Sequence, residues 1–230
     1  MTSTFAQRLQ RVARDPRRFV YFGRERIAGV RRAVDVERRE VALTFDDGPD
    51  ATYTPALLDR LAELDVPATF FVVGNAAKAQ LPLMRRLIEA GHAIGIHTSE
   101  HADLTNLSFR AVRDELRRSR SDLEPIAGRP VKLLRPPHGS VHAHVGAAAR
   151  LEGLDVWLWS VDPEDWRPRV PVATIASRAR VVAGDVVVLH DGINDPIDEA
   201  ARDRSTTIDA IGPIVEAGRR AGLRFVTLPH

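Results

Sequence analysis

Short apolar runs alternate with amphipathic segments along most of the chain. Seven runs of four to six residues are rich in β-branched and aromatic side chains, which predicts strands. They occupy residues 41–45, 69–73, 93–97, 132–135, 156–161, 186–189 and 225–228. Between them, apolar residues recur with the helical period, in stripes over 56–64, 83–88 and 111–123. The pattern therefore predicts strands and helices in regular alternation.

The connections between these predicted elements are short. Gly91, Gly128 and Gly184 each stand after a helical stripe and just before a strand, where glycine commonly ends a helix. Strands that alternate with helices over short connections form parallel sheets, either closed into a small barrel or left open. The chain of 230 residues contains no internal repeat or flexible linker. We therefore expect an α/β fold with one catalytic domain over residues 40–230.

Residues 1–39 differ from the rest of the chain. Eleven arginines and four acidic residues give this segment a net charge of +7, which leaves −5 for the remainder. Phe5, Leu9 and Val12 share one helical face, so we expect a basic helical extension. It either packs on the outer or lower surface of the domain, or makes a weak contact with an anionic membrane or polymer.

Composition narrows the class of protein. Hydrophobic residues make up 44% and charged residues 28% of the chain, as in soluble globular proteins. No apolar run is long enough to span a bilayer and the first residues do not resemble a signal peptide, so we expect a cytoplasmic protein, with an exported form left open. Cysteine is absent, so any metal is held by His, Asp or Glu. The basic residues cluster in one terminal segment without a recognition motif, which argues against nucleic-acid binding.

Polar clusters follow five of the predicted strands, at the ends where parallel α/β folds build active sites. The clusters are Asp46-Asp47-Gly48-Pro49, His97-Thr98-Ser99-Glu100-His101, Arg135-Pro136-Pro137-His138-Gly139, Asp162-Pro163-Glu164-Asp165-Trp166 and His190-Asp191-Gly192. A chance scatter of polar residues would not repeat this placement five times. The repetition favours a catalytic site.

Two of these clusters suggest a metal site. His97 and His101 are four residues apart, so one helical turn brings both imidazoles to one side. With a carboxylate they make a three-ligand site that keeps a position open, as catalytic zinc sites do. Asp46 and Asp47 are adjacent, so one can bind metal while the other faces substrate. Taken singly, a histidine pair on the surface and an Asp-Gly-Pro turn are ordinary features, but five clusters together favour chemistry.

The five clusters resemble the motifs of the polysaccharide deacetylase family, the NodB-homology domain of carbohydrate esterase family four. Thr44 to Pro49 is similar to the first motif, His97 to His101 to the second, Arg135 to Gly139 to the third, Asp162 to Trp166 to the fourth, and Val188 to Asp191 to the fifth. The resemblance runs from about residue 41 to the end of the chain. It implies a distorted (β/α)7-type barrel with parallel strands.

The resemblance also implies roles for individual residues. Asp47, His97 and His101 would hold a divalent metal, Zn²⁺ first and Co²⁺ or another ion second, which activates water and the acetyl carbonyl. Asp46 would be the general base, oriented by Arg135. His190 would be the general acid, charged by Asp165 or Asp162. The remaining assignments are the backbone N–H of His138 for the oxyanion, and Trp166 and Val188 for the acetyl pocket.

Two positions depart from the family pattern. His138 stands where an aromatic residue is usual before the glycine of the third motif, which changes the wall of the substrate groove. Val188 stands where leucine is usual in the fifth motif, which implies a slightly roomier acetyl pocket.

Three functions fit these residues. The first is a metal-dependent deacetylase that removes acetyl groups, chiefly N-acetyl, from a poly- or oligosaccharide or glycoconjugate containing N-acetylhexosamine. The second is a related amidohydrolase acting on a non-carbohydrate amide or cyclic imide. The third, of another class, is a non-catalytic module that binds carbohydrate or a membrane surface; the intact set of Asp46, the metal ligands and His190 argues against it. The sugar, its chain length and the oligomeric state stay open.

Overall fold

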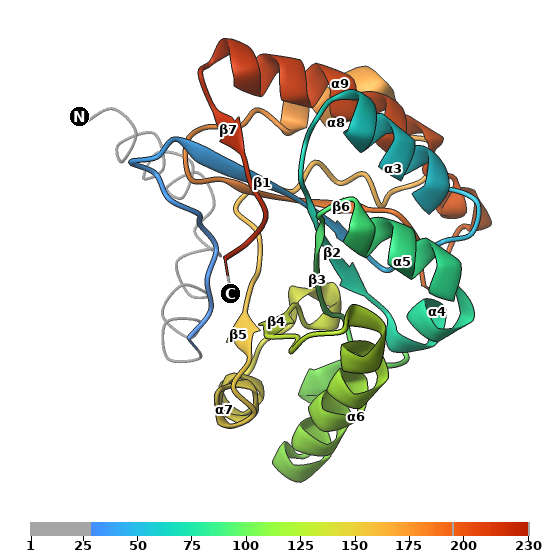
Figure 1. The fold of residues 1–230 in the computed structure, drawn as a ribbon, viewed down its shortest axis with the longest axis vertical. Helices are drawn as coiled ribbons and strands as arrows, with labels where there is room; N and C mark the ends of the chain where they lie inside the picture. The colour runs from blue at the N-terminus through green and yellow to red at the C-terminus, as the bar shows by residue number, and fades with distance from the viewer. Residues whose placement is uncertain (1–28, 195, 230) are drawn as a thin grey trace.

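The computed structural model describes residues 29–194 and 196–229, which form one α/β unit with the helices on the outside of a curled sheet (Figure 1). The strands are β1 (Glu40–Asp46), β2 (Thr69–Val72), β3 (Ala93–Ile96), β4 (Leu133–Leu134), β5 (Asp155–Val156), β6 (Val186–His190) and β7 (Arg224–Phe225). The helices are α3 (Thr54–Glu63), α4 (Gly74–Ala79), α5 (Leu81–Glu89), α6 (Phe109–Ala127), α7 (Ala143–Leu151), α8 (Val172–Arg178) and α9 (Ser205–Arg220).

All pairings in the sheet are parallel, as the alternation of elements predicted. The strand order is β5-β4-β3-β2-β1-β6, and β7 pairs with the beginning of β1. The (β/α)7-type fold is thus confirmed, as a sheet curled into a half-barrel. Because β1 pairs directly with β6, its last residue, Asp46, sits opposite the last residue of β6, His190.

The gap between β5 and β6 is covered by irregular chain. Arg31 forms an isolated bridge with Trp157, and Ala33 forms one with Asp185, next to β6. Val161 bridges to Val187 of β6. The predicted strand 156–161 is therefore shortened to a two-residue β5, because the chain after Val156 leaves β4 and crosses to β6.

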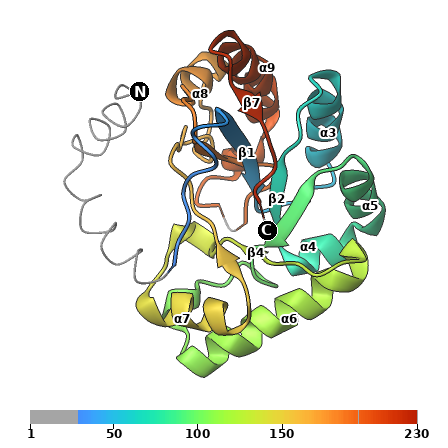
Figure 2. The same cartoon turned by 60° about the vertical axis from the view of Figure 1, so that its left-hand side comes forward.

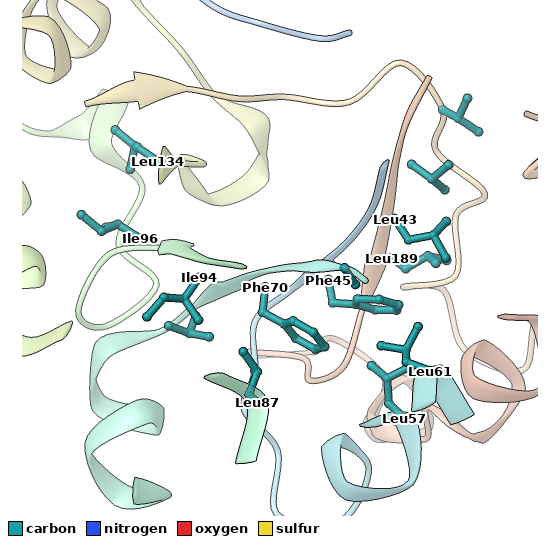
Figure 3. Packing of buried hydrophobic residues seen from close by; sticks show 14 of the residues in the cluster. Leu43, Phe45, Leu57, Leu61, Phe70, Leu87, Ile94, Ile96, Leu134 and Leu189 are labelled. Atoms are coloured by element: carbon teal, nitrogen blue, oxygen red, sulfur yellow. The ribbon is translucent and has the colours of Figure 1, made fainter. Parts of the chain in front are cut away.

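The larger apolar cluster lies between the sheet and the surrounding helices. Phe45 of β1 stacks on Phe70 of β2 with ring centroids 5.1 Å apart, and both rings are fully buried. Figure 3 shows Leu57 and Leu61 of α3 beneath Phe45. The periodic leucines of the sequence therefore do what an amphipathic stripe predicts: they cover the outer face of the strands.

A second, smaller cluster fills the concave side of the sheet at the end where the strands begin. It consists of Val34, Ala42, Phe71, Ala93, Leu133, Trp157, Val186 and Leu228. Val34 comes from the segment before β1, and Leu228 comes from the segment after β7. Figure 2 shows the chain after β7 running inward among the strands to the C-terminus. Gly95 permits this packing, because a Cβ there would lie 2.6 Å from the Phe71 ring. One end of the half-barrel is thus filled, and polar residues occupy the other.

The predicted basic helix falls largely outside the described residues. Residues 1–28 lie outside the part of the chain that the structure describes. Residues 29–39 form isolated bridges and a turn, where the sequence predicted a helix. The reason is packing: Arg31 N–H donates to Val156 O at 2.8 Å, and Val34 N–H to Gly184 O at 3.1 Å, which covers the open side of the sheet. Among the described helices, none has the length and apolar character needed to cross a membrane.

Candidate active site

The clusters singled out in the sequence meet at the carboxyl ends of the strands. β1 brings Asp46 and the following Asp47, β3 leads into His97, and β6 ends at His190. The side chains of Asp47, His97 and His101 come together, with their potential ligand atoms all within 4.8 Å of one another. These three residues are the trio that the sequence assigned to a metal.

The contacts within this trio fit a divalent cation. Asp47 Oδ1 lies 3.2 Å from His97 Nε2 and 3.1 Å from His101 Nε2. His97 Nδ1 lies 2.7 Å from the carbonyl oxygen of Arg135, which can only accept, so the proton of a neutral His97 sits on Nδ1. The Nε2 lone pair then faces a carboxylate oxygen. Two acceptors held this close in a buried site call for a cation between them, and the N,N,O ligand set suits Zn²⁺.

Asp47 is held in the ionised form that a metal ligand needs. Burial raises the pKa of Asp47, but its interactions with His101 and His97 outweigh that effect and hold the pKa well below the usual value. Asn194, which belongs to none of the five clusters, adds two contacts to Asp47. Its backbone N–H lies 3.3 Å from Asp47 Oδ2 and its side-chain Nδ2 lies 3.3 Å from Asp47 O. Asn194 follows the fifth cluster closely, but nothing in its own pattern marks it.

The loop that carries both histidines is strained and firmly anchored. Thr98 and His101 have φ angles of 63° and 57°, a region that non-glycine residues seldom adopt. Asn75 N–H, in α4, donates to Ser99 O at 2.9 Å, and Ser99 N–H donates to Glu115 Oε1 of α6 at 2.7 Å. Glu115 is buried, which is unusual for a glutamate. Helices α4 and α6 therefore both anchor the loop that carries His97 and His101.

Asp46 lies beside a fully buried arginine. Arg135 Nη1 donates to Asp46 Oδ1 at 2.6 Å and to Thr44 Oγ1 at 2.7 Å. The guanidinium also lies over the Phe71 ring, 4.2 Å from its centroid. Burial lowers the pKa of Arg135, while the neighbouring Asp46 raises it. The predicted pairing of Arg135 with Asp46 is thus present in the structure.

His190 is paired with Asp165. Its Nδ1 lies 2.8 Å from Asp165 Oδ1, and its backbone N–H donates to Asp165 Oδ2 at 2.9 Å. Burial lowers the pKa of His190, but the charge of Asp165 and the hydrogen bond to it outweigh burial and raise the pKa to about 9. The other candidate carboxylate, Asp162, accepts the backbone N–H of Glu164 at 2.7 Å and caps a local turn. Asp165 is therefore the carboxylate that binds the imidazole.

Asp165 itself is supported from the beginning of α9. Thr207 Oγ1 lies 3.0 Å from Asp165 Oδ2, and Arg204 Nη1 donates to Asp165 O at 2.8 Å. Arg204 and Thr207 are each 1% exposed. They lie outside all five clusters, and no sequence pattern connects them with the fourth.

The remaining predicted residues lie around this centre. His138 has a φ angle of 59° and its exposed ring stands edge-on to His101, with centroids 4.9 Å apart. Val188 is buried, two residues before His190 on the same side of β6. Trp166 is 41% exposed, with the Arg167 guanidinium 5.0 Å from its ring centroid. The structure thus puts His138 and Trp166 at the surface and Val188 in the interior.

Asp191 has a structural place that the sequence did not reveal. Its Oδ2 accepts the Thr54 hydroxyl at 2.6 Å, and a Cβ at Gly48 would collide with its carboxyl group. Burial raises the pKa of Asp191 to about 7. The carboxyl of Asp191 therefore packs against the turn that follows Asp47, which explains glycine at position 48.

Comparison with known proteins agrees with this geometry. The sequence matches the family model for polysaccharide deacetylase over residues 33–157. A peptidoglycan-N-acetylglucosamine deacetylase of Bacillus cereus is 35% identical over 191 residues, which cover 82% of this chain and 85% of that protein. A chitooligosaccharide deacetylase of Sinorhizobium fredii is 38% identical over 196 residues, covering 83% of this chain and 90% of the other.

Solved structures give the same result. A peptidoglycan N-acetylglucosamine deacetylase, crystallised with 4-naphthalen-1-yl-N-oxidanyl-benzamide, superposes with a TM-score of 0.79 at 31% identity, covering 89% of this chain and 92% of that one. A family 4 carbohydrate esterase from Streptomyces lividans, in complex with acetate, gives a TM-score of 0.72 at 29% identity, with coverage of 81% and 91%.

Proposed function

The chain belongs to the polysaccharide deacetylase family, and from this we propose that it hydrolyses the N-acetyl groups of N-acetylglucosamine units with a bound Zn²⁺ ion. It is a metal-dependent deacetylase of carbohydrates that contain N-acetylhexosamine. The preference for N-acetylglucosamine follows from two relatives, whose names specify peptidoglycan N-acetylglucosamine and chitooligosaccharides.

One observation carries the proposal: a carboxylate and an imidazole, Asp46 and His190, lie opposite each other at neighbouring strand ends, beside the metal ligand Asp47. Asp46 is a carboxylate whose Oδ1 is occupied by Arg135. His190 is an imidazole kept protonated by Asp165. Hydrolysis of an amide needs a base for the attacking water and an acid for the departing amine, and both lie at the ends of the neighbouring strands β1 and β6.

The proposed mechanism assigns one task to each group. Asp47, His97 and His101 would hold the ion, which supplies Lewis acidity toward the acetyl carbonyl and water when bound. Asp46 accepts the proton of the attacking water on Oδ2, because Arg135 occupies Oδ1. His190 donates a proton from Nε2 to the leaving nitrogen, because its Nδ1 is engaged by Asp165 Oδ1.

The residues at the edge of the site would bind the rest of the substrate. We assign the backbone N–H of His138 to the oxyanion that forms on the acetyl oxygen; removal of one such donor typically costs about 10²–10³-fold in rate. Val188 and Trp166 would line the acetyl group, with Val188 forming the buried wall and Trp166 the exposed one.

The test is acetate release by metal-stripped protein with and without added Zn²⁺ or Co²⁺. The substrates are chitooligosaccharides, peptidoglycan fragments and acetylated xylan, and Asp46→Asn is measured in parallel. Asp59→Asn, an exposed carboxylate that pairs with Arg86 on the helical side, is the matched control. We expect metal-dependent release from the N-acetylated substrates, lost in D46N and kept in D59N.

Other outcomes separate the alternatives. Release from acetylated xylan alone would replace N-acetyl by O-acetyl chemistry. Stoichiometric metal binding without release from any sugar would favour a non-carbohydrate amide as substrate. Tight binding of an oligosaccharide without turnover would favour a binding module, and a protein that binds no metal would overturn the mechanism.

A further inference from the structure

Both carboxylate oxygens and the backbone oxygen of Asp165 have hydrogen-bond partners. Its Oδ1 meets His190 Nδ1 at 2.8 Å, and its Oδ2 accepts the backbone N–H of His190 at 2.9 Å and the Thr207 hydroxyl at 3.0 Å. Arg204 Nη1 donates to its backbone oxygen at 2.8 Å. Asp165 is 1% exposed, so these protein groups, and not solvent, decide how the carboxylate lies.

Without Thr207, the geometry of this carboxylate would depend on His190 alone. The terminal torsion of an aspartate is broad and roughly two-fold, so a single partner leaves the carboxylate free to turn. Both remaining contacts on its carboxylate oxygens come from His190, the residue that Asp165 orients. A hydroxyl from α9 is an independent reference point, because α9 packs on α3 and α8, outside the sheet.

The Thr207 side chain is well suited to this task. A β-branched residue in a helix has few χ1 rotamers, and a threonine hydroxyl there often bonds back to a carbonyl of the preceding turn. Here it reaches Asp165 instead. A hydrogen bond to a charged carboxylate is stronger than one between neutral groups. Arg204, at the residue before α9, ties the same helix end to the Asp165 backbone and, through Nη2, to Ala201 O.

We propose that Thr207 is a positioning residue of the deacetylation reaction: its hydroxyl fixes the Asp165 carboxylate so that His190 keeps the orientation needed to protonate the leaving nitrogen. Arg204 supports the same residue through a hydrogen bond from its side chain to the backbone oxygen of Asp165. The proposal rests on the proposed role of His190 as the acid. It adds to the site a residue from α9, outside the five sequence clusters.

The experiment compares three variants of the metal-loaded enzyme. Thr207→Val keeps the shape of the side chain and removes the hydroxyl, Thr207→Ser keeps the hydroxyl, and Thr206→Val makes the same change at the neighbouring, less buried position. We expect kcat on a chitooligosaccharide to fall about 10-fold in T207V, the effect of one lost hydrogen bond to a charged group. KM and metal affinity should stay within about two-fold, T207S should recover most of kcat, and T206V should match the parent.

A second measurement separates this proposal from the proposed function. The Nδ1 proton of His190, bound to a carboxylate, is observable by nuclear magnetic resonance in the folded enzyme with or without turnover. In T207V we expect it to move upfield and exchange faster with solvent, and in T207S to stay near the parent position. If the parent enzyme releases acetate from none of the sugars, the function fails while this signal still tests the positioning role.

Several results would overturn the positioning role. They are a T207V enzyme with the parent kcat and an unchanged His190 signal, a T207S enzyme as slow as T207V, or an equal loss in T206V. If T207V does not fold, Thr207→Ala removes the same hydroxyl with a smaller side chain and is judged by the same two measurements.

Discussion

His92 shows at the residue scale how a titratable side chain can serve folding alone. Its Nδ1 accepts the backbone N–H of Ala68 at 3.1 Å, and its ring stands edge-on to Phe70 with centroids 5.4 Å apart. Burial lowers the pKa of His92 to about 4. The folded protein therefore keeps His92 neutral under conditions that protonate it in the unfolded chain.

The resulting pH dependence has a definite sign. Between about pH 6.5 and pH 4 the unfolded chain binds the proton and the folded protein does not, so the contribution of His92 is complete above pH 6.5 and is lost as the pH falls toward 4. The loss amounts to at most about 3 kcal/mol. Urea unfolding of the parent and of His92→Gln at pH 7 and pH 5 measures it, and an equal drop in both proteins would contradict the prediction.

His190 gives the opposite prediction, for activity. As the proposed acid it must be protonated, which its pKa of about 9 allows up to that pH. In Asp165→Asn the charge that raises the pKa is gone while the burial that lowers it remains. We expect the alkaline limb of the kcat/KM profile to move down by about 1–3 pH units, on top of a loss in rate. An unchanged limb would show that another group sets it.

Whether a site residue could be predicted from the sequence depends on how far along the chain its partner lies. Those in the five clusters could be predicted because each cluster is continuous and follows a strand. Thr207 lies 42 residues from Asp165, and Asn194 lies 147 residues from Asp47. A single threonine or asparagine at such distances carries no pattern, because the contact arises only when the sheet curls.

At the scale of elements, α6 anchors the loop between His97 and His101 that carries the metal ligands. Glu115 Oε1 accepts a hydrogen bond from the Ser99 N–H, and Glu115 Oε2 accepts one from Arg118 Nη2 at 2.6 Å. Without this anchor, the strained loop between His97 and His101 can relax and separate the two imidazoles. We expect Glu115→Ala to weaken Zn²⁺ binding about 10–100-fold, the usual effect of groups that hold metal ligands in place.

Competition with a chromophoric chelator measures this effect without any substrate. Glu115→Gln keeps an oxygen for the Ser99 N–H and should bind Zn²⁺ more tightly than E115A. Asp114→Ala, on the exposed side of the same helix, is the matched control and should bind like the parent. Equal affinity in E115A and D114A would remove α6 from the account of the metal site.

The elements also show where a sequence pattern stops being informative. The apolar run 156–161 correctly indicated burial, but β5 comprises only Asp155–Val156. Ser160 N–H donates to Val186 O at 2.9 Å, on the far side of the gap in the sheet. An apolar run predicts that a segment is buried; it does not predict which neighbour receives its hydrogen bonds.

At the scale of the whole molecule, metal binding should stabilise the fold. Asp47 follows β1 and the two histidines follow β3, so one ion would join two strands that are separated by β2. Zn²⁺ at about 100 times its Kd adds about 2.7 kcal/mol, which corresponds to a rise in Tm of roughly 5–10 °C for a chain of this size. Calorimetry with and without Zn²⁺ measures the shift, and His101→Ala should abolish it.

The parallel α/β architecture was predictable because it depends on a repeated pattern. The segment that covers the gap between β5 and β6 was not predictable. Seven alternating units indicated a parallel α/β fold, and the structure has that fold. The cover over the gap is supplied by Arg31 and Ala33, in a segment that by composition suggested a basic helix. The same segment joins both apolar clusters: Val34 is 6% exposed in the smaller one, and Val30 packs against the larger one.

The segment before β1 and the segment after β7 both run across the filled end of the half-barrel. Val34 and Leu228 share the cluster there, and Leu228 N–H donates to Thr69 Oγ1 at the first residue of β2. Anything fused beyond residue 229 is therefore attached at the end of the half-barrel opposite Asp47, His97 and His101. Immobilised on a resin through that end, the enzyme would present its metal-ligand residues outward, toward an insoluble polymer that cannot diffuse into the resin.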